Sequence, residues 1–298
     1  MLFVSRPSLS EVKGGDTTQI LATASALSSL GIKVKLSDGT EQISDYDLVH
    51  FFNLIRPNDI LSLLKKINIP LVVSTIYVDY SAFDQHERKG LQGFLARHLG
   101  KFQVEYLKSI IRWLSGQEKL GSWRYLLGHK RAMQEVLSMA SAILPNSENE
   151  ADRVKGDLGY SSLSKIIPNA VDTRIFYIDH DVPREDRLVL CVGQFDGRKN
   201  QHRLIQALKA ENIRLVFIGK ASPNNEAYRN YCQELAGDQA EFIEFLSQDK
   251  LRSWYNRAKV HVLPSWFETT GLTSLEAGAC GCNLVVSSGG DTKSYFKE

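Results

Sequence analysis

The chain has 298 residues, of which 43% are hydrophobic and 23% are charged, with 36 Lys and Arg against 34 Asp and Glu. This length is long for one hydrophobic core and suits two domains, and the composition is that of an ordinary globular protein. No run approaches the 18 apolar residues of a membrane-spanning helix, and the apolar stretch at the N-terminus is too short for a signal peptide. The sequence therefore excludes a helical membrane-spanning protein, and the expected location is the cytoplasm.

Short apolar runs rich in β-branched residues alternate with helical patterns along almost the whole chain. We predict strands at 2–5, 33–36, 48–52, 71–76, 142–145 and 164–168, and, after a polar stretch, at 187–193, 214–219, 241–246, 260–264 and 283–288. Runs that are apolar on both faces and separated by helices are typical of parallel sheets covered on both sides. The predicted fold class is α/β, with two doubly wound, Rossmann-like parallel sheets.

Helix signals lie between these strands. The first helical pattern ends at Gly31, a natural C′ residue, and Ser147 followed by Glu150 forms a capping box at the start of another helix. Four cysteines lie in or beside apolar runs without the spacing of a disulfide or metal motif, so we expect reduced, buried thiols: Cys191, Cys232, Cys280 and Cys282.

The segment 172–187 is the predicted domain boundary, because it is polar, contains a proline and lacks periodicity. We expect an N-terminal domain over 1–175 and a C-terminal domain over 185–298. Ligands of doubly wound folds bind at the carboxyl ends of the strands, so a cleft is expected to face those ends of both sheets.

A stretch over about 80–140 has no strand signal and is predicted to be a basic helical insert. From 86 to 131 it holds ten Lys and Arg against three Glu, a net charge of +7. Apolar residues recur there as one helical face: Leu91, Leu95, Leu99, Phe102, Tyr106, Ile110, Trp113 and Leu114. One interpretation is a helical cap that packs on its own domain. The other is a basic, aromatic surface that contacts anionic lipid headgroups or an acidic acceptor.

The stretch SWFETTGLTSLEAG, 265–278, places Glu268 and Glu276 on either side of a Thr-Thr-Gly turn. A helix is predicted to begin near Gly271, and the N–H groups of its first turn form an anion site together with the helix dipole. Glu276 lies about 7 Å along the helix, where its carboxylate can accept hydrogen bonds from a ribose diol. Glu268 lies before the turn, where it can hold the transferred sugar. The spacing suits a nucleotide-sugar clamp, whose turn residues are Thr269, Thr270, Gly271, Leu272 and Thr273.

This stretch resembles the E-x7-E motif of retaining glycosyltransferases of family 4, the "glycosyl transferases group 1", which have the GT-B fold. Three other stretches are similar to that family, in the right order. Residues 11–20 look like its N-terminal Gly-Gly loop, 166–176 like its "PNGVD…F" segment with Ala170 for the usual glycine, and 192–201 like its phosphate-binding loop. The resemblance covers nearly the whole chain except the basic insert. It implies that 1–175 is an acceptor-side domain and that 185–298 is a nucleotide-sugar-binding domain.

The resemblance assigns roles to residues of the phosphate-binding loop. Lys199 would neutralise the leaving diphosphate, and Arg198 is the candidate to replace the arginine that the family usually has at Gln194. A solvated pair of loop cations is the plain alternative for Lys199 and Arg198. The catalytic set implied is Glu268, Lys199 and Arg198, and Gly193, Gln194, Gly14 and Gly15 join the donor-binding set, the last two because glycine lets the backbone approach a ligand closely.

Acceptor-side candidates come from the N-terminal half. Many relatives place a histidine after the strand that corresponds to 71–76, where this chain has Tyr77 and Asp79, so no catalytic histidine is assigned. His50 matches a position that is commonly histidine in the family, and a buried core histidine explains it equally well. Two D-x-D stretches lack the strand context of a metal motif, so neither a metal nor a cofactor is expected.

The resemblance implies a retaining, metal-independent glycosyltransferase of the hexosyltransferase type. It would move a sugar from a nucleoside-diphosphate sugar to a saccharide or glycolipid acceptor in envelope polysaccharide or glycolipid synthesis. Peripheral contact with an anionic membrane at its inner face is expected through 86–131. Nucleic acid is not an expected partner, because the basic residues lie in one insert without interleaved strand aromatics.

Members of the family normally continue beyond the position of Glu298 with another strand and helices. We therefore expect an incomplete C-terminal domain and a fragment that is inactive alone. Two alternatives remain open. One is a non-catalytic or partner-dependent binding module with the GT-B fold. The other is a sugar-nucleotide epimerase or hydrolase, which would need a general base that the sequence does not reveal.

Overall fold

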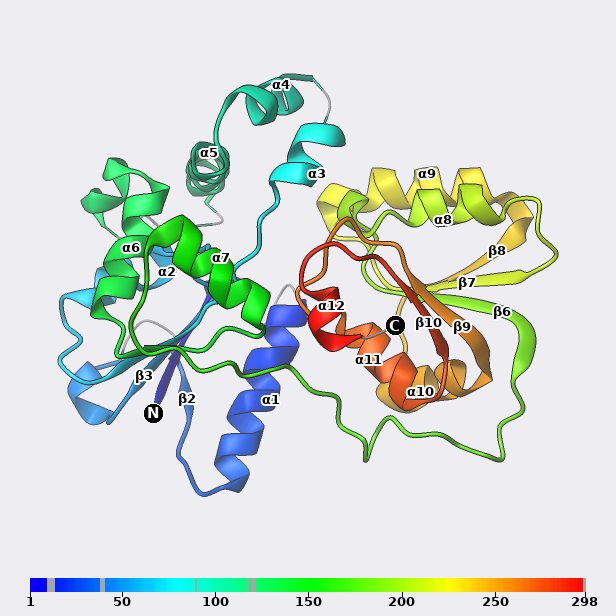
Figure 1. Ribbon diagram of the computed structural model, residues 1–298, viewed down its shortest axis with the longest axis horizontal. Helices are drawn as coiled ribbons and strands as arrows, with labels where there is room; N and C mark the ends of the chain where they lie inside the picture. The colour runs from blue at the N-terminus through cyan, green and yellow to red at the C-terminus, as the bar shows by residue number, and fades with distance from the viewer. Residues whose placement is uncertain (10–13, 38–40, 89, 117, 119–121, 297–298) are drawn as a thin grey trace. The chain divides into compact units, whose positions relative to one another are not determined.

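The computed structural model describes every residue except 10–13, 38–40, 89, 117, 119–121 and 297–298. It divides into two compact units, Met1–Pro168 and Asn169–Glu298, each built on its own parallel sheet (Figure 1). Residues 11–13 of the predicted Gly-Gly loop lie outside the described residues. Within the described residues, no helix combines the length and the apolar character that crossing a bilayer requires.

The first unit has a five-stranded parallel sheet in the order β2-β1-β3-β4-β5. Its strands are β1 (Leu2–Val4), β2 (Lys35–Leu36), β3 (Val49–Phe52), β4 (Leu71–Ser74) and β5 (Ala142–Ile143). Its α-helices are α1 (Gly15–Ser29), α2 (Asn58–Leu64), α3 (Ser81–His86), α4 (Gly90–His98), α5 (Lys101–Leu114), α6 (His129–Met139) and α7 (Glu148–Leu158). Its 3₁₀ helices are η1 (Pro7–Leu9), η2 (Ile43–Asp45) and η3 (Trp123–Leu127).

The second unit has a parallel sheet in the order β10-β9-β6-β7-β8. Its strands are β6 (Glu185–Val192), β7 (Arg214–Ile218), β8 (Ala240–Ile243), β9 (Ala258–Leu263) and β10 (Asn283–Val286). Its helices are α8 (Gln201–Leu208), α9 (Glu226–Ala236), α10 (Gln248–Arg257), α11 (Leu272–Ala279) and α12 (Thr292–Tyr295), with 3₁₀ turns η4 (Gly197–Lys199), η5 (Pro223–Asn225) and η6 (Gly237–Gln239).

Both faces of the second sheet are covered, which explains why its strands are almost continuously apolar. Leu188 and Leu190 of β6 pack on the face that carries α10 and α11, whereas Cys191, one residue on, packs on the face that carries α8 and α9 (Figure 1). Phe176, inside the predicted boundary segment, is also buried in the α10–α11 side of this core, so that part of 172–187 packs on the second unit. The two five-stranded parallel sheets confirm the predicted α/β class.

Each predicted strand is present except 164–168, for which the prediction was wrong. That segment forms a single bridge, between Ser164 and Ile143. Lys165 and Ile167 donate backbone hydrogen bonds to the end of β5, but Ile167 is exposed. The segment therefore has no buried apolar face to extend the pairing into a strand.

The predicted helix ends agree with the structure. Gly31 has φ = 83° after the end of α1, and its N–H donates to Ser28 O, so a glycine is needed there. Ser147 is the N-cap of α7, because its Oγ accepts a hydrogen bond of 3.0 Å from Glu150 N–H. All four cysteines are free and buried.

Glu150 is fully buried and ties α7 to the end of β4. Its Oε1 accepts hydrogen bonds from the Thr75 hydroxyl and, at 2.8 Å, from Tyr77 N–H. Its Oε2 accepts from Asn146 N–H at 2.9 Å. A buried carboxylate costs free energy unless donors surround it, and here three donors from two segments do so.

The single helical face predicted for the basic insert was wrong. Gly100 has extended backbone angles and separates α4 from α5, so the apolar residues belong to two helices. On α5, Phe102, Tyr106 and Ile110 pack against the core of the first unit, but Leu114 is 72% exposed. The insert is therefore a cap on its own unit that also carries an exposed apolar side.

We expect Ser147→Ala to lower the free energy of unfolding by about 1 kcal/mol, because the N-cap bond to Glu150 is lost. Urea titration of the whole chain measures this change. Ser138→Ala is the control, since the exposed Ser138 hydroxyl bonds only the Glu135 carbonyl within its own helix. An equal change in both variants would contradict the assignment of Ser147 as a stabilising cap.

Candidate functional site

The predicted donor-site residues of the second unit follow the carboxyl ends of β6 and β9. Gly193 comes directly after β6, and the turn before α11 follows β9. β6 and β9 are hydrogen-bonded parallel neighbours, so their carboxyl ends meet at one edge of the sheet. Side chains that are 69 residues apart in the sequence are thereby brought into contact.

Lys199 and Glu268 form an ion pair at this edge, with Nζ and Oε1 2.5 Å apart. Their side chains are 29% and 12% exposed, so the pair is shielded from water but remains within reach of a ligand. The backbone supports the contact, because Trp266 N–H donates a 2.8 Å hydrogen bond to Arg198 O. The loop that contains Arg198 and Lys199 and the stretch 265–278 are therefore joined.

Glu268 is also held from its other side by the loop after β10. Its N–H donates to Gly289 O at 3.2 Å, and its carbonyl accepts from Asp291 N–H at 2.7 Å. A Cβ on Gly289 would lie 2.2 Å from Trp266 O, and one on Gly290 would lie 2.2 Å from Glu268 O. Only glycine permits this approach. This role was not predicted from the sequence, although the Gly-Gly pair was a visible signal for close backbone packing.

The turn before α11 has the predicted geometry. Gly271 is the N-cap and adopts φ = 71°, and its carbonyl accepts from Ser274 N–H and Leu275 N–H. Leu272 and Thr273 are the first two residues of α11. N–H groups in the first turn of a helix have no acceptor within the helix and can donate to an anion.

Thr270 supports this turn from inside. It is buried, and its hydroxyl accepts a 2.8 Å hydrogen bond from the Asn169 side chain. Asn169 N–H in turn donates to Tyr295 Oη at 3.1 Å. Asn169 belongs to the "PNAVD" stretch, which was recognised in the sequence only as a family segment. Thr269, next to Thr270, is half-buried, as are Leu272 and Thr273 on α11.

Glu276 is half-buried on α11, and its Oε2 accepts a 3.0 Å hydrogen bond from Tyr255 Oη. Burial raises the pKa of Glu276 to about 7, and the hydrogen bond from Tyr255 only partly offsets this effect. Tyr255 is fully buried on α10 and was not predicted. It fixes one carboxyl oxygen of Glu276, and the other can accept a bond from a ligand.

Arg198 is engaged by its own loop. Its Nε and Nη2 donate to the two carboxylate oxygens of Asp196, at 2.9 and 2.6 Å. Burial raises the pKa of Asp196, but the hydrogen bonds and the charge of Arg198 outweigh this effect and hold that pKa below its ordinary value. Much of the Arg198 charge is therefore offset by Asp196. Gln194 is exposed, and its carbonyl accepts from the Gln201 side chain at 2.9 Å.

Of the candidates in the first unit, His50 belongs to the core. It is 5% exposed, bonds Ser74 Oγ at 2.9 Å and stacks on Phe52 with ring centroids 4.0 Å apart. Burial lowers the pKa of His50 to about 4, so the ring is neutral at pH 7. His50 is therefore a buried core histidine in this structure, which is one of the two interpretations that the sequence allowed.

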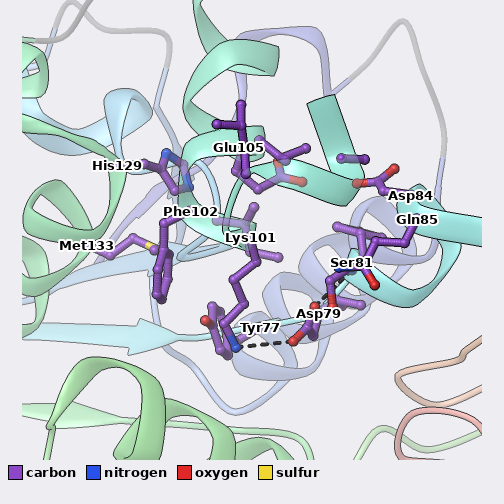
Figure 2. Close-up of a pocket in the computed structure, with 16 residues that line it drawn as sticks. Tyr77, Asp79, Ser81, Asp84, Gln85, Lys101, Phe102, Glu105, His129 and Met133 are labelled. Atoms are coloured by element: carbon purple, nitrogen blue, oxygen red, sulfur yellow. Dashed lines mark hydrogen bonds and ion pairs between the residues drawn. The ribbon is translucent and has the colours of Figure 1, made fainter. Parts of the chain in front are cut away.

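Tyr77 and Asp79 line a cavity beneath α5 (Figure 2). Tyr77 Oη donates to Asp157 at 2.9 Å, and Lys101 Nζ lies 3.1 Å from Asp79 and 2.5 Å from Asp157. The cavity volume is about 30 Å³, which matches one or two water molecules and is too small for a sugar. The Tyr77 hydroxyl and the Asp79 carboxylate therefore contact Asp157 and Lys101 of α5, respectively, in this structure.

Gly14 is the N-cap of α1, and Gly15 is its first residue. Gly14 N–H donates to Thr17 Oγ1 at 3.3 Å, and Arg6 pairs with Asp16 at 2.8 Å across the same turn. A Cβ on Gly14 would lie 2.9 Å from an Asp16 oxygen, so the glycine accommodates this local carboxylate. Among the residues that the structure describes, no group of three or more His, Cys, Asp or Glu is arranged to hold a metal.

Comparison with known proteins finds a family match for part of the second unit's sequence. Residues 175–298 match the family described as Glycosyl transferases group 1. A D-inositol 3-phosphate glycosyltransferase from Kribbella flavida is 27% identical over 180 residues, which are 53% of this chain and 42% of that protein. The chain thus spans less than half the length of this curated relative.

Solved structures match over the whole chain. Sucrose-phosphate synthase from Thermosynechococcus elongatus has a TM-score of 0.73 at 17% identity, covering 97% of this chain and 81% of that one. Anabaena HepE in complex with UDP and glucose has a TM-score of 0.70 at 14% identity, covering 100% and 83%. At these identities the likeness establishes the fold, which is GT-B, as predicted.

We expect Gly290→Ala to lower the free energy of unfolding by more than about 1 kcal/mol, because φ = 80° and the contact with Glu268 O both disfavour a side chain. Urea titration measures the loss. Gly156→Ala is the matched control: Gly156 lies inside α7, and a Cβ at this position would have no atom within 4 Å, so this variant should gain about 0.5–1 kcal/mol. A loss of the same size in both variants would contradict the explanation that a side chain at position 290 collides with Glu268 O.

Glu276 should make stability depend on pH. Its folded pKa of about 7 lies above the ordinary value of 4.5, so the folded state holds a proton that the unfolded state releases. Stability therefore falls as the pH rises from about 4.5 through 7, by at most about 3 kcal/mol. We expect Glu276→Gln to abolish this part of the pH dependence in urea titrations between pH 5 and 8. An unchanged slope would show that the Glu276 carboxyl is not shifted.

Proposed function

We propose that this chain, whose residues 175–298 match the group 1 glycosyl transferases on a GT-B fold, transfers a sugar, of hexose type, from a nucleoside diphosphate to an acceptor hydroxyl with retention at the anomeric carbon. The observation that carries the proposal is the Lys199–Glu268 contact next to the first turn of α11. It combines a cation, a carboxylate and helix N–H donors, which together suit a diphosphate that carries a sugar.

The proposed chemistry exchanges two bonds on one face of the sugar. The bond from the anomeric carbon to the diphosphate oxygen breaks, and a bond to the acceptor oxygen forms on the same face. The acceptor's proton passes to the departing diphosphate. Negative charge grows on the diphosphate in this step, and preorganised donors that meet it lower the barrier.

Each site residue has a part in this proposal. Lys199 and the N–H groups of Leu272 and Thr273 offset the charge on the diphosphate, and because they supply positive charge we propose that no metal is required. Glu268 orients Lys199 and accepts hydrogen bonds from hydroxyls of the transferred sugar. Glu276, held by Tyr255, accepts from the ribose diol.

The relatives support this substrate class. One is named as a D-inositol 3-phosphate glycosyltransferase, and HepE was crystallised with UDP and glucose. We therefore propose a nucleoside-diphosphate sugar as donor and a saccharide or glycolipid as acceptor, in envelope polysaccharide or glycolipid synthesis. A thermal-shift screen of UDP-, GDP-, ADP- and dTDP-sugars identifies the donor, because a true ligand at 100 Kd adds about 2.7 kcal/mol of stability.

A binding module without catalysis is the second candidate, and one observation favours it. Arg198, the only proposed substitute for the family's usual arginine, directs its guanidinium to Asp196. Donor binding in the screen without release of nucleoside diphosphate, with a range of saccharide and glycolipid acceptors, would favour this candidate.

With the donor identified, we expect Lys199→Ala to lower kcat by about 10²–10³, because charge stabilisation at the diphosphate is lost. Release of nucleoside diphosphate measures the rate. Lys209→Ala is the control, since Lys209 is exposed beyond the end of α8 and outside the site. Near-wild-type turnover in Lys199→Ala would overturn the role of Lys199.

Glu276→Ala should raise the Kd for the donor while leaving kcat nearly unchanged.

A further inference from the structure

Helix α5 is apolar on two sides. On the inner side, Phe102, Tyr106 and Ile110 pack against the core of the first unit. On the outer side, Leu107, Ile111 and Leu114 recur at helical spacing and are 37%, 61% and 72% exposed. An apolar stripe that no described part of its own unit covers is unusual for a helix and marks a contact surface.

The 3₁₀ helix η3, which follows α5 in the chain, carries further exposed apolar side chains. Tyr125 is fully buried, lies 5.3 Å from the Tyr106 ring of α5 and bonds His129 at 2.8 Å, so η3 is anchored beside α5. The residues around Tyr125 face outward instead: Trp123, Leu126 and Leu127 are 69%, 63% and 53% exposed. We define the α5–η3 surface as Leu107, Ile111, Trp113, Leu114, Trp123, Leu126 and Leu127 (α5 is labelled in Figure 1).

The charges near this surface fall into two groups. In the first group, basic residues are neutralised by carboxylates: Lys101 by Asp79 and Asp157, Lys108 by Asp84 and Glu105, and Arg112 by Glu118. Three of these five acids lie outside 86–131. These three acids offset three of the seven net positive charges counted from the sequence.

The second group is exposed, and it is basic. Arg97, Lys130 and Arg131 are exposed side chains. The carboxylates in the described part of 90–131 are Glu105 and Glu118, and both are already in ion pairs. The unpaired, exposed formal charge in the described part of 90–131 is therefore positive, which complements an anionic partner.

We propose that the α5–η3 surface, with Arg97, Lys130 and Arg131, binds the interface of an anionic lipid bilayer. Exposed leucine, isoleucine and tryptophan side chains next to cations are the composition of an interfacial helix. Side chains that are more than half exposed project outward, and lipid accommodates them without a complementary pocket. A protein partner would need such pockets. This inference does not depend on the proposed transferase activity.

Flotation with vesicles tests the proposal on the whole chain. We expect binding to phosphatidylcholine vesicles that contain phosphatidylglycerol, and much weaker binding to phosphatidylcholine alone. Each exposed Lys or Arg at an anionic surface contributes about fivefold to the partition coefficient. The triple variant Arg97→Gln, Lys130→Gln and Arg131→Gln should therefore lose about a hundredfold. Its control is Lys33→Gln, Lys65→Gln and Lys66→Gln, three exposed lysines elsewhere in the first unit.

A second pair of variants tests the apolar part. Ile111→Gln, Leu114→Gln and Trp123→Gln should lose at least about tenfold in partitioning, since buried CH₂ groups drive insertion. The matched control replaces exposed apolar residues outside the surface: Leu30→Gln, Ile32→Gln and Leu163→Gln. Circular dichroism of all variants verifies that the fold is retained.

Brominated phospholipid should quench tryptophan fluorescence, and the double variant Trp113→Phe and Trp123→Phe should abolish the quenching.

The results that overturn the proposal are distinct. The absence of binding to either vesicle would reject it, as would equal losses in the surface variants and their controls. Self-association that needs no lipid and disappears in the Ile111, Leu114 and Trp123 variant would assign the surface to a second copy instead. Donor binding in the thermal-shift screen would be unaffected by any of these outcomes, so the two proposals fail separately.

Discussion

Close backbone packing around Glu268 is the constraint on which the candidate site depends. Glu268 hydrogen-bonds Gly289 and Asp291 through its backbone on one side, and its carboxylate pairs with Lys199 on the other. The approach of Gly290 to the Glu268 carbonyl leaves no room for a side chain. A carboxylate held in this way keeps its position without a ligand, and such preorganisation is what charge stabilisation in a transfer reaction requires.

In the first unit, two buried carboxylates, Glu118 and Glu150, need hydrogen-bond donors around them. Glu150 is surrounded by donors from the end of β4 and the start of α7, and Glu118 by Asn58, Ser109 and Arg112. Removing the Arg112 side chain would leave the buried Glu118 carboxylate without its cation, which costs several kcal/mol. The bond from Asn58 to Glu118 anchors the insert to α2, and the outer side of α5 is left for an external contact.

Reasoning from the sequence identified Glu268, Lys199 and the start of α11, because each belongs to a local pattern: a strand, a turn with glycine, and a helix. It also predicted ten strands correctly from apolar runs. It failed at 164–168, where a similar apolar run is exposed, since burial is not readable from the run itself. It did not find Tyr255 or Asn169, because their partners Glu276 and Thr270 lie 21 and 101 residues away.

What the sequence determined by itself is the alternation of strands and helices, and hence two parallel sheets whose strand ends carry glycines, a lysine and two glutamates. These features follow from periodicity and turn chemistry, which act over a few residues. Only the tertiary structure decided which charges are already paired: Arg198 with Asp196, and Lys101 with Asp79 and Asp157. Ion pairs depend on distance in space, which the chain's order along the sequence does not specify.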